Sequence, residues 1–369
     1  MRVYQCIHKY KPYISYFEAK YKPVQNGISF NEWRNLLIAD GFASCNILKP
    51  AIDGKPEEVF YTIWDYENLQ CKWAKENGLK TNNLDEIKLA QLEEFNPDVF
   101  YNISPYVDGN FIQKILYKKE MVKVCWDAVI TNNPAFHENY HLRFTLFEPY
   151  VKFWKQHGFN SFLLSPAFSP SWDDLNRDQK DIDILFYGQY MEYFFSERNL
   201  ILKELVNWAR KKELVFQLHL QMPHNKPLIN IRGLKQLTKW LPVAPKIISD
   251  NALFPIYGQL LYETIARSKI VINGFGNFNG LYKDNMRNYE STGCGAFLIS
   301  EEGIYPDHFI HNTDFYTYRS FNELFEKIEQ ILSLPDQGHA MTETTREKLK
   351  LIYSKENQWS AFIEAVNSI

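Results

Sequence analysis

The chain has 369 residues, of which 41 are Lys or Arg and 44 are Asp or Glu, giving a formal net charge of −3. This length suits two domains that each bury a core, and the near-balance of charge argues against a surface that binds nucleic acid or an anionic membrane. The sequence has no apolar run of about 18 residues and no apolar N-terminal segment, so we expect neither a transmembrane span nor a signal peptide.

Short apolar or alternating runs predict β-strands in the first half of the chain, at residues 57–64, 98–104, 121–129, 143–147 and 161–165. Helices are predicted between the first of these strands, at residues 68–77 and 84–95, the second ended by Asn96-Pro97. Residues 10–30 are aromatic and basic without a clear period, and we expect a long loop there. Residues 165–181 are rich in Pro, Ser and Asp and have the composition of a linker.

The second half repeats the alternation of strand and helix. Strands are predicted at residues 182–188, 214–220, 269–273 and 296–300, with a further short apolar run at 246–249. Helices are predicted at 198–211, 231–241, 259–268, from near Lys283, and at 355–366. This alternation is typical of parallel sheets covered by helices on both faces. We therefore predict an α/β protein with a domain at 1–168, a linker at 169–181 and a second domain at 182–369.

Residues 261–300 carry the most informative pattern. A buried strand is followed by a Gly- and Asn-rich loop and by a short helix that contains Arg287 and Glu290. Free backbone N–H groups and the helix dipole favour phosphate at such a helix N-terminus. Arg287 and Glu290 are three residues apart and so share one helical face, where one can meet a phosphate and the other can accept hydrogen bonds from sugar hydroxyls. This arrangement suits a nucleotide-sugar.

The runs SKIVIN (268–273), MRNYESTGCGAFLIS (286–300) and ELFEKIEQIL (323–332) resemble the C-terminal half of CgeB-like, group 1-related glycosyltransferases of GT-B architecture. The matching positions are Asn273, Arg287, Glu290, Gly293 and Gly295, and the resemblance extends back to Gly188 and Arg198. It implies two Rossmann-like domains whose parallel sheets face an interdomain cleft, with the last helix packed back on the N-terminal domain. It also implies transfer of a sugar from a nucleotide-diphosphate donor, expected to be a UDP-sugar, to a glycan, lipid-linked sugar or polysaccharide-precursor acceptor.

The resemblance implies donor-binding roles, each with a structural alternative. Glu290 would bind the ribose hydroxyls, or be a surface carboxylate. Arg287 would neutralise the leaving diphosphate and Arg198 would be a second phosphate-binding cation, or both would form ordinary helix contacts. The remaining donor-side positions would allow close approach of the donor, hydrogen-bond it or hold its base, or would serve as turns and caps: Gly188, Tyr257, Asn273, Gly274 and Gly293.

The acceptor side and any base should come from the N-terminal domain. Asp127 follows the strand at 121–126, where a carboxylate could deprotonate an acceptor hydroxyl in an inverting reaction. His137 and Asp108 are rival candidates, and each of the three could equally be a polar loop residue. Retaining GT-B enzymes often carry E-x7-E, but Tyr282 stands eight residues before Glu290, so no retaining mechanism is assigned from this motif.

Two other motifs favour different chemistry. His137 to His141 form a literal H-E-x-x-H, the zinc-protease signature. Pro134 before the motif and the strand predicted at 143–147 after it leave room for a helix of barely two turns. The alternative is a polar loop or short helix that lines the cleft. Gly274 to Gly280 resembles a dinucleotide fingerprint with one residue too many. Asp173-Asp174 lies in the linker and Asp181-x-Asp183 precedes a strand, so we expect no metal and no cofactor.

Other functions therefore stay open beside the transferase. A nucleotide-sugar epimerase, a non-catalytic glycan-binding protein and a zinc hydrolase are the alternatives. The five cysteines lack C-x-x-C spacing, which is typical of reduced thiols, and we expect a cytoplasmic protein, or one peripheral at a membrane. Aromatic residues make up 16% of the chain, either as large cores or as sugar-stacking platforms. The oligomeric state stays open.

Overall fold

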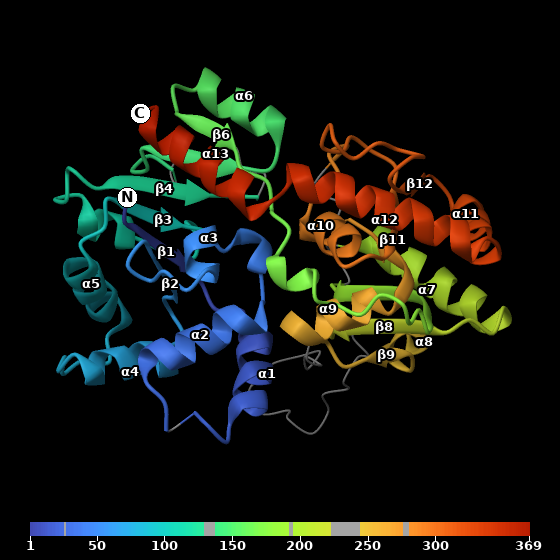
Figure 1. Cartoon of the computed structure of the whole chain (residues 1–369), viewed down its shortest axis with the longest axis horizontal. Coiled ribbons are helices and arrows are strands. Elements are labelled where there is room, and N and C mark those ends of the chain that lie inside the picture. Colours follow the sequence, from blue (N-terminus) through green and yellow to red (C-terminus); the bar gives the residue numbers. More distant parts are fainter. Residues whose placement is uncertain (26, 129–136, 192–194, 223–243, 276–279) are drawn as a thin grey trace, which may run out of the picture. The chain divides into compact units, whose positions relative to one another are not determined.

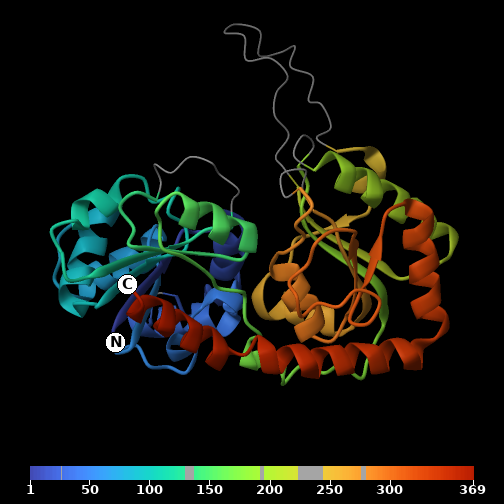
Figure 2. The ribbon, with the colours of Figure 1, turned by 90° about the horizontal axis from the view of Figure 1, so that it is seen from above.

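The computed structural model describes every residue except 26, 129–136, 192–194, 223–243 and 276–279. The chain divides into two compact units, each built on a parallel sheet with helices packed beside it (Figure 1, Figure 2). The first unit contains Met1–Ser171, Tyr257–Gln259 and Ile352–Ile369, and the second contains Trp172–Ile256 and Leu260–Leu351.

The sheet of the first unit has the strand order β2-β1-β3-β4-β5-β6, and all its pairs are parallel. The strands are β1 (Val3–Ile7), β2 (Val59–Ile63), β3 (Val99–Asn102), β4 (Val122–Trp126), β5 (Leu142–Thr145) and β6 (Ser161–Leu163). The five strands predicted for this half are confirmed. β1 was not predicted, although it pairs with both β2 and β3 and so lies inside the sheet.

Alternate residues of these strands enter two separate cores, as the two-residue period of a strand requires. Tyr4, Phe60 and Phe100 pack into one core with the helices α1 (Lys11–Tyr21), α2 (Phe30–Asp40), α4 (Glu67–Glu76) and α5 (Leu84–Phe95). Their strand neighbours pack on the other face with α3 (Lys49–Ile52) and α13 (Lys355–Asn367). The remaining helix of this unit is α6 (Glu148–Gln156).

The predicted loop at residues 10–30 is wrong. Residues 11–21 form α1, in which Tyr13, Ile14 and Phe17 are buried. The buried face of α1 consists largely of aromatic residues, and the apolar residues of its sequence do not follow a clear helical period. The helix therefore depends on tertiary packing for its stability. The predicted helices at 68–77 and 84–95 are confirmed as α4 and α5. Asn96 ends α5 in the left-handed conformation, with φ of 44°.

The sheet of the second unit has the order β12-β11-β10-β7-β8-β9, again with parallel pairs. Its strands are β7 (Ile182–Gln189), β8 (Phe216–Gln221), β9 (Ala252–Leu253), β10 (Ser268–Asn273), β11 (Phe297–Glu301) and β12 (Tyr316–Tyr318). Its helices are α7 (Ser196–Lys211), α8 (Lys246–Ser249), α9 (Gly258–Ala266), α10 (Met286–Gly293), α11 (Phe321–Ser333) and α12 (Pro335–Ile352). The apolar run at 246–249 is a helical turn, and the helix predicted at 231–241 lies outside the described residues.

The last helix, α13, is anchored to the first unit by polar contacts to buried backbone. The Lys355 ammonium donates to the carbonyls of Ser44 (2.7 Å) and Ile47 (2.8 Å), and burial lowers its pKa to about 7. The Phe168 amide donates to the Tyr353 carbonyl at 2.7 Å. These contacts fix the start of α13 beside the segment in which the chain leaves the first unit at Ser171.

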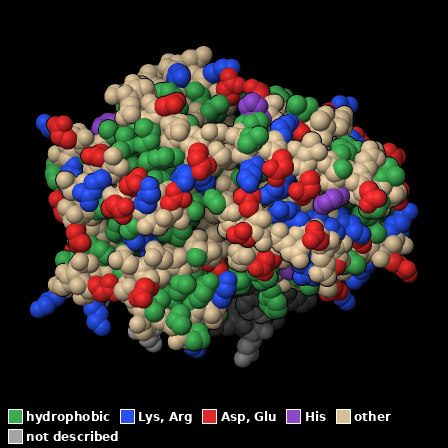
Figure 3. All heavy atoms as spheres, viewed as in Figure 1, with side chains coloured by type: hydrophobic (Ala, Val, Ile, Leu, Met, Phe, Trp, Pro, Cys, Tyr) green, Lys and Arg blue, Asp and Glu red, His purple; other side chains and the backbone are tan. Residues whose placement is uncertain are grey.

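The visible surface carries side chains of both charges interspersed, in keeping with the near-zero net charge (Figure 3). Among the described residues, no helix is long and apolar enough to cross a membrane. The five cysteines are free thiols, four of them buried and Cys71 half-buried.

Candidate functional site

Six of the eight predicted donor residues gather at the carboxyl edge of the second sheet, where β11, β10 and β7 are neighbours. In open parallel sheets, ligands bind at this edge. β7 ends in Gly188-Gln189, β10 ends at Asn273 before Gly274, and β11 ends at Glu301. Helix α10 begins at the same edge, with Asn285 as its N-cap, whose side chain accepts from the Arg287 amide at 3.0 Å.

Arg287, in the first turn of α10, is held by two oxygens that lie at strand ends. Its Nη2 donates to the Tyr187 carbonyl at 2.7 Å, and its Nη1 donates to Asn273 Oδ1. Its Nε is buried without a hydrogen-bond partner among the described residues. The guanidinium therefore keeps an unused donor beside the N-terminus of α10, where the helix dipole also favours an anion.

Arg198, in the first turn of α7, is the second cation of this edge. Its side chain is buried, its Nη2 donates to the Gln189 carbonyl, and its guanidinium lies 3.5 Å from the ring centroid of Phe195. Burial and the positive charge of Arg287 lower its pKa to about 9. Two mutually repelling guanidinium groups, that of Arg198 buried and that of Arg287 half-buried, predict a bound anion, because an anion would offset both the repulsion and the lost hydration.

The predicted glycines Gly188 and Gly274 leave room for these two arginines. A Cβ on Gly188, whose φ is 150°, would lie 2.9 Å from Nη2 of Arg287. A Cβ on Gly274 would lie 2.7 Å from Cγ of Arg198. Both positions therefore need glycine so that the arginines can pack against the strand ends. This role differs from direct approach of backbone to the donor, which the sequence predicts.

Glu290 lies one turn after Arg287 on α10 and is buried. Its Oε2 accepts from the Tyr187 hydroxyl at 2.7 Å. Burial raises the pKa of this carboxyl, while the Tyr187 hydrogen bond and the Arg287 charge oppose the rise. Tyr187 accounts for one carboxyl oxygen, so the other oxygen remains able to accept hydrogen bonds from a ligand.

Asn273 connects the strand end to α10. Its Nδ2 donates to Asn288 Oδ1 at 2.7 Å and to Asn285 Oδ1 at 3.2 Å, while its Oδ1 accepts from Arg287. The side chain is fully buried and occupied by protein groups. Asn273 therefore positions Arg287, whereas the sequence allowed either a donor contact or a loop cap.

Two predicted donor residues lie elsewhere. Tyr257 belongs to the first unit, where its ring packs edge-on against Tyr10, Tyr16 and Phe42 at centroid distances of 5.6–6.0 Å. Gly293 is the last residue of α10, roughly 9 Å along the helix from Arg287, and its carbonyl accepts from Arg346. Neither residue lies at this edge, because neither position follows a strand of the second sheet, and their donor-binding roles stay predictions.

Four residues of this edge were missed from the sequence. Tyr187 orients Glu290, and Lys283 Nζ pairs with Glu301 Oε2 at 2.9 Å. Glu301 Oε1 accepts from the Phe275 amide at 2.9 Å. Asp284 is fully buried just before the α10 N-cap. The available signal was position, since Tyr187 and Glu301 end predicted strands at the edge where ligands bind.

Asp284 predicts a pH-dependent stability. Burial raises the pKa of its carboxyl to about 8, although Tyr289 and Asn288 donate hydrogen bonds that oppose the rise. An Asp whose pKa rises on folding stabilises the native state fully below its unfolded pKa of about 3.9, and this contribution is lost as pH rises through about 8. Asn does not ionise, so the free energy of unfolding of Asp284→Asn should not fall in this way. Urea unfolding should therefore show that the variant becomes more stable relative to wild type as pH rises. Parallel stability curves for the two proteins would contradict this.

The carboxyl edge of the first sheet brings Asp127 and His137 together. Asp127 directly follows β4, and its amide donates to the Phe144 carbonyl at 2.9 Å. His137 Nε2 lies 3.2 Å from Asp127 Oδ2, and the two side chains are 1% and 10% exposed, His137 being the more buried. Burial raises the pKa of Tyr106 and Tyr150, and the nearby Asp127 charge adds to both shifts, so these two tyrosines lie near the carboxylate. The His137 side chain is therefore fixed in the protein interior, and the Asp127 carboxylate is the more solvent-accessible of the two groups.

The third base candidate, Asp108, is a partner in a buried ion pair. Both of its oxygens accept from Lys88 Nζ at 2.8 Å, and Asn102 Nδ2 donates to Oδ2 at the same distance. The Lys88 ammonium also lies 4.0 Å from the ring centroid of Phe111. Burial raises the pKa of the Asp108 carboxyl and the Lys88 charge opposes this. A carboxylate with its oxygens engaged in this way suits a structural role, so these contacts give the general-base prediction for Asp108 no support.

The H-E-x-x-H motif does not form a helix. Residues 137–139 form a turn and His141 directly precedes β5. His137 faces Asp127, whereas His141 Nδ1 accepts from the Lys123 amide at 3.2 Å. The two histidines are therefore not stacked one helical turn apart, which the zinc-protease arrangement requires. Within the part of the chain that the structure describes, no group of three His, Cys, Asp or Glu side chains is placed to hold a metal.

His8 is a further polar group at this edge that the sequence did not single out. It directly follows β1, and its Nδ1 lies 2.6 Å from the hydroxyl of Ser104, which follows β3. Burial lowers the pKa of His8, and the nearby charge of Asp65 opposes this. β1, β3 and β4 are adjacent, so His8, Ser104 and Asp127 lie along one edge.

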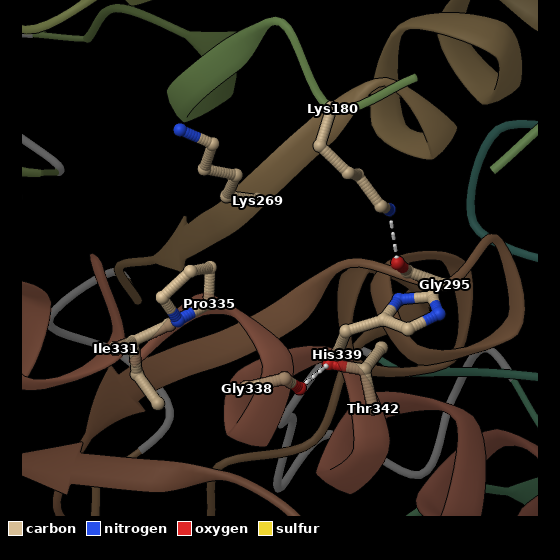
Figure 4. A pocket seen from close by; sticks show the side chains of 8 residues that line it. All are labelled: Lys180, Lys269, Gly295, Ile331, Pro335, Gly338, His339 and Thr342. Atoms are coloured by element: carbon tan, nitrogen blue, oxygen red, sulfur yellow. Dashed lines mark hydrogen bonds between the residues drawn. The ribbon is translucent and has the colours of Figure 1, made fainter. Parts of the chain in front are cut away.

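A small cavity in the second unit is unsuited to the donor. Its volume is about 80 Å³, and its walls include Lys180, Lys269 and His339 (Figure 4). The Lys180 ammonium points to the Gly295 carbonyl and also donates to Ala266 at 2.7 Å, while Lys269 pairs with Asp183. The cavity is below the 300–1,000 Å³ of ordinary ligand pockets and its two ammonium groups already have partners.

The second half of the chain matches a known protein family. Residues 198–364 match the family described as Glycosyl transferase-like, and this range covers α7, α10 and the intervening strands. A search of curated proteins found no match.

Among solved structures, a mutant of S. aureus TarM in complex with fondaparinux, alpha-GlcNAc-glycerol and UDP aligns with a TM-score of 0.53 and 16% identity. That alignment covers 77% of this chain and 59% of TarM, so the chain spans less than two thirds of TarM. Sucrose-phosphate synthase from Thermosynechococcus elongatus aligns with a TM-score of 0.50 and 15% identity, over 82% of this chain and 79% of its own.

A putative UDP-N-acetylglucosamine 2-epimerase from Listeria monocytogenes aligns with a TM-score of 0.50 and 10% identity, over 99% of this chain and 96% of its own. At such low identities the alignments show the fold. The chain therefore has the two-domain, Rossmann-like GT-B fold predicted from its sequence, and residues 198–364 match the Glycosyl transferase-like family.

Proposed function

We propose that the protein transfers a sugar from a nucleoside-diphosphate donor to a hydroxyl group of a glycan or polysaccharide-precursor acceptor, without a metal ion. The observation that carries this proposal is the convergence of Arg198, Arg287 and Glu290 at one strand edge of a glycosyltransferase domain. TarM, which shares the fold, is known in complex with UDP, and this supports a UDP-sugar as the donor here.

The donor side supplies charge stabilisation. As the bond between the sugar and the diphosphate breaks, negative charge develops on the leaving phosphate oxygen. The unpaired Nε donors of Arg198 and Arg287 and the N-terminus of α10 would stabilise this charge. Glu290 would accept hydrogen bonds from the ribose hydroxyls through the oxygen that Tyr187 leaves free.

The first unit would supply the acceptor chemistry. The acceptor hydroxyl attacks the anomeric carbon, its proton passes to Asp127, and the nucleoside diphosphate leaves with the electron pair of the broken bond. His137 donates from Nε2 to Asp127 and so holds the carboxylate in place. Tyr106 and Tyr150 lie near that carboxylate and would supply aromatic surface to a sugar ring.

A thermal-shift screen tests the donor class first. A nucleoside diphosphate at 100 times its dissociation constant should stabilise the protein by about 2.7 kcal/mol. An assay for released nucleoside diphosphate then separates transfer from epimerisation, because only transfer requires an acceptor. Binding of no nucleotide would favour a non-catalytic glycan-binding protein, and conversion of the donor without acceptor would favour an epimerase.

Glu290→Gln is expected to weaken donor binding by about 1–3 kcal/mol, because hydrogen bonds to a charged acceptor are stronger than those to a neutral one. The amide can still accept from Tyr187, so the fold should persist. Calorimetry with the nucleoside diphosphate measures the change. Glu302→Gln, which removes an exposed partner of Arg319 in the same unit, is the matched control and should bind normally. Equal affinity for all three proteins would remove Glu290 from the site.

Metal removal is expected to leave transfer intact. Arg198 and Arg287 would neutralise the negative charge of the diphosphate, which a divalent cation neutralises in other enzymes. EDTA should therefore not lower the turnover rate. The purified protein should contain much less than one zinc per chain by elemental analysis. A stoichiometric zinc that is lost when His137 and His141 are replaced together would contradict this and revive the hydrolase alternative.

A further inference from the structure

A cavity of about 360 Å³ lies at the amino edge of the first sheet. Its lining includes Arg2, which precedes β1, Glu57, which precedes β2, and Phe95, which ends α5 before β3. In a parallel sheet the two strand ends face opposite ways, so this edge is the far one from Asp127. The volume falls within the 300–1,000 Å³ of small-molecule sites.

Arg34 is the polar group in the interior of this cavity. It lies on α2 one turn after Phe30, and its side chain is 3% exposed. Its Nε is buried without a hydrogen-bond partner, and its guanidinium forms no hydrogen bond or ion pair with any residue that the structure describes. Burial lowers its pKa to about 10. A buried cation without a counter-ion is costly, and one that lines an open cavity is placed to receive an anion.

The inner walls are aromatic. Phe30, Phe60, Trp73 and Phe95 line the cavity and are at most 9% exposed. The Arg34 guanidinium lies 5.4 Å from the ring centroid of Phe30 and 5.3 Å from that of Phe60, so these rings hold it in place. The Arg2 guanidinium lies 4.5 Å from the ring centroid of Phe95, so the aromatic lining presents apolar ring edges to the cavity.

The rim is acidic and exposed. Glu57, Glu76 and Glu94 line the opening together with the exposed residues Arg2, Asn31 and Asn77, so carboxylates outnumber the one exposed cation. Oε1 of Glu76 accepts from the Phe30 amide at 2.8 Å, and Glu57 and Glu94 are exposed. Three carboxylates disfavour a doubly charged phosphate but accept hydrogen bonds readily from hydroxyl groups.

We propose that this cavity binds a sugar ring that bears a single carboxylate, of the uronic-acid type. The carboxylate pairs with Arg34, the apolar side of the ring packs against the aromatic lining of the cavity, and the hydroxyls donate to the glutamates of the rim. The site is separate from the donor residues, which belong to the other unit, and from Asp127 at the opposite edge of the sheet. It does not depend on the transfer reaction proposed above.

Calorimetry on the full chain with D-glucuronate, D-glucose and inorganic phosphate tests this proposal. Glucuronate should bind saturably and at least about 10-fold more tightly than glucose, because only glucuronate carries the carboxylate. Arg34→Met should weaken glucuronate binding by about 10–100-fold, since it removes a charge-assisted pair. Arg287→Met should leave glucuronate binding unchanged, which separates this site from the donor site.

A second variant keeps the test decisive if Arg34→Met folds poorly. Asn31 is exposed at the second position of α2, so Asn31→Trp obstructs the rim without entering the core and should cause the same loss. Asn322→Trp, at the second position of α11, is the matched control and should bind normally. The proposal is overturned if glucuronate does not bind the wild type or binds no better than glucose. It is also overturned if phosphate binds more tightly, or if both Arg34→Met and Asn31→Trp bind glucuronate as the wild type does.

Discussion

Replacing Asp127 by Asn is expected to lower kcat by about 10²–10⁴-fold and to leave donor affinity nearly unchanged. Asp127 is held at the end of β4 by a hydrogen bond from its backbone amide to the Phe144 carbonyl. His137 Nε2, 3.2 Å from Asp127 Oδ2, holds the side chain. The Asn side chain keeps the shape and the contact to Phe144 but cannot take a proton. Steady-state kinetics with saturating donor, together with nucleotide calorimetry, separate the two effects.

Two further variants sharpen the Asp127 test. Asp53→Asn, which removes a surface ion pair with Lys49 in the same unit, is the matched control and should turn over normally. His137→Ala should reduce kcat less than Asp127→Asn, because His137 is almost fully buried and acts by holding Asp127. Normal turnover of Asp127→Asn with an inactive His137→Ala would reverse the two roles. Activity in both variants would place the base elsewhere or indicate a retaining reaction that needs none.

Replacing Arg287 by Met is expected to lower kcat/KM by about 10²–10³-fold, the usual effect of losing one preorganised group that stabilises transition-state charge. Arg287 is preorganised by Tyr187 and Asn273, so its free Nε is already aimed when negative charge develops on the leaving phosphate. Arg287→Lys keeps the charge but loses the planar fork, and should fall between Met and wild type.

The controls for Arg287 distinguish chemistry from folding. Arg319→Met removes an exposed ion pair with Glu302 in the same unit and should leave kcat/KM unchanged. Thermal unfolding monitored by circular dichroism should show that Arg287→Met is folded at the assay temperature. A folded Arg287→Met with wild-type kcat/KM would show that the leaving group is stabilised by other groups, with Arg198 the first to examine.

The sequence by itself determined most of the helices and strands and the shared helical face of Arg287 and Glu290. Apolar runs bounded by turn residues located the strands β2 to β8, β10 and β11 to within a few residues, because a buried parallel strand must be apolar on both faces. The three-residue spacing of Arg287 and Glu290 likewise put both on one face of α10, since that relation depends only on the helical period. α1 could not be predicted in the same way, because packing, and not a strong helical pattern, stabilises it.

The tertiary structure alone decided which residues meet. Tyr187 and Glu290 are 103 positions apart, and they become partners because β7 lies beside β10 and α10 begins at the same edge. The same long-range pairing assigned Tyr257 to the first unit and Asp108 to Lys88, against the roles expected from their sequence neighbours. Strand order brings distant segments together, and no local period encodes that order. For this reason most of the helices and strands and the shared face of α10 could be predicted, whereas the surroundings that tune Glu290, Asp108 and Arg34 could not.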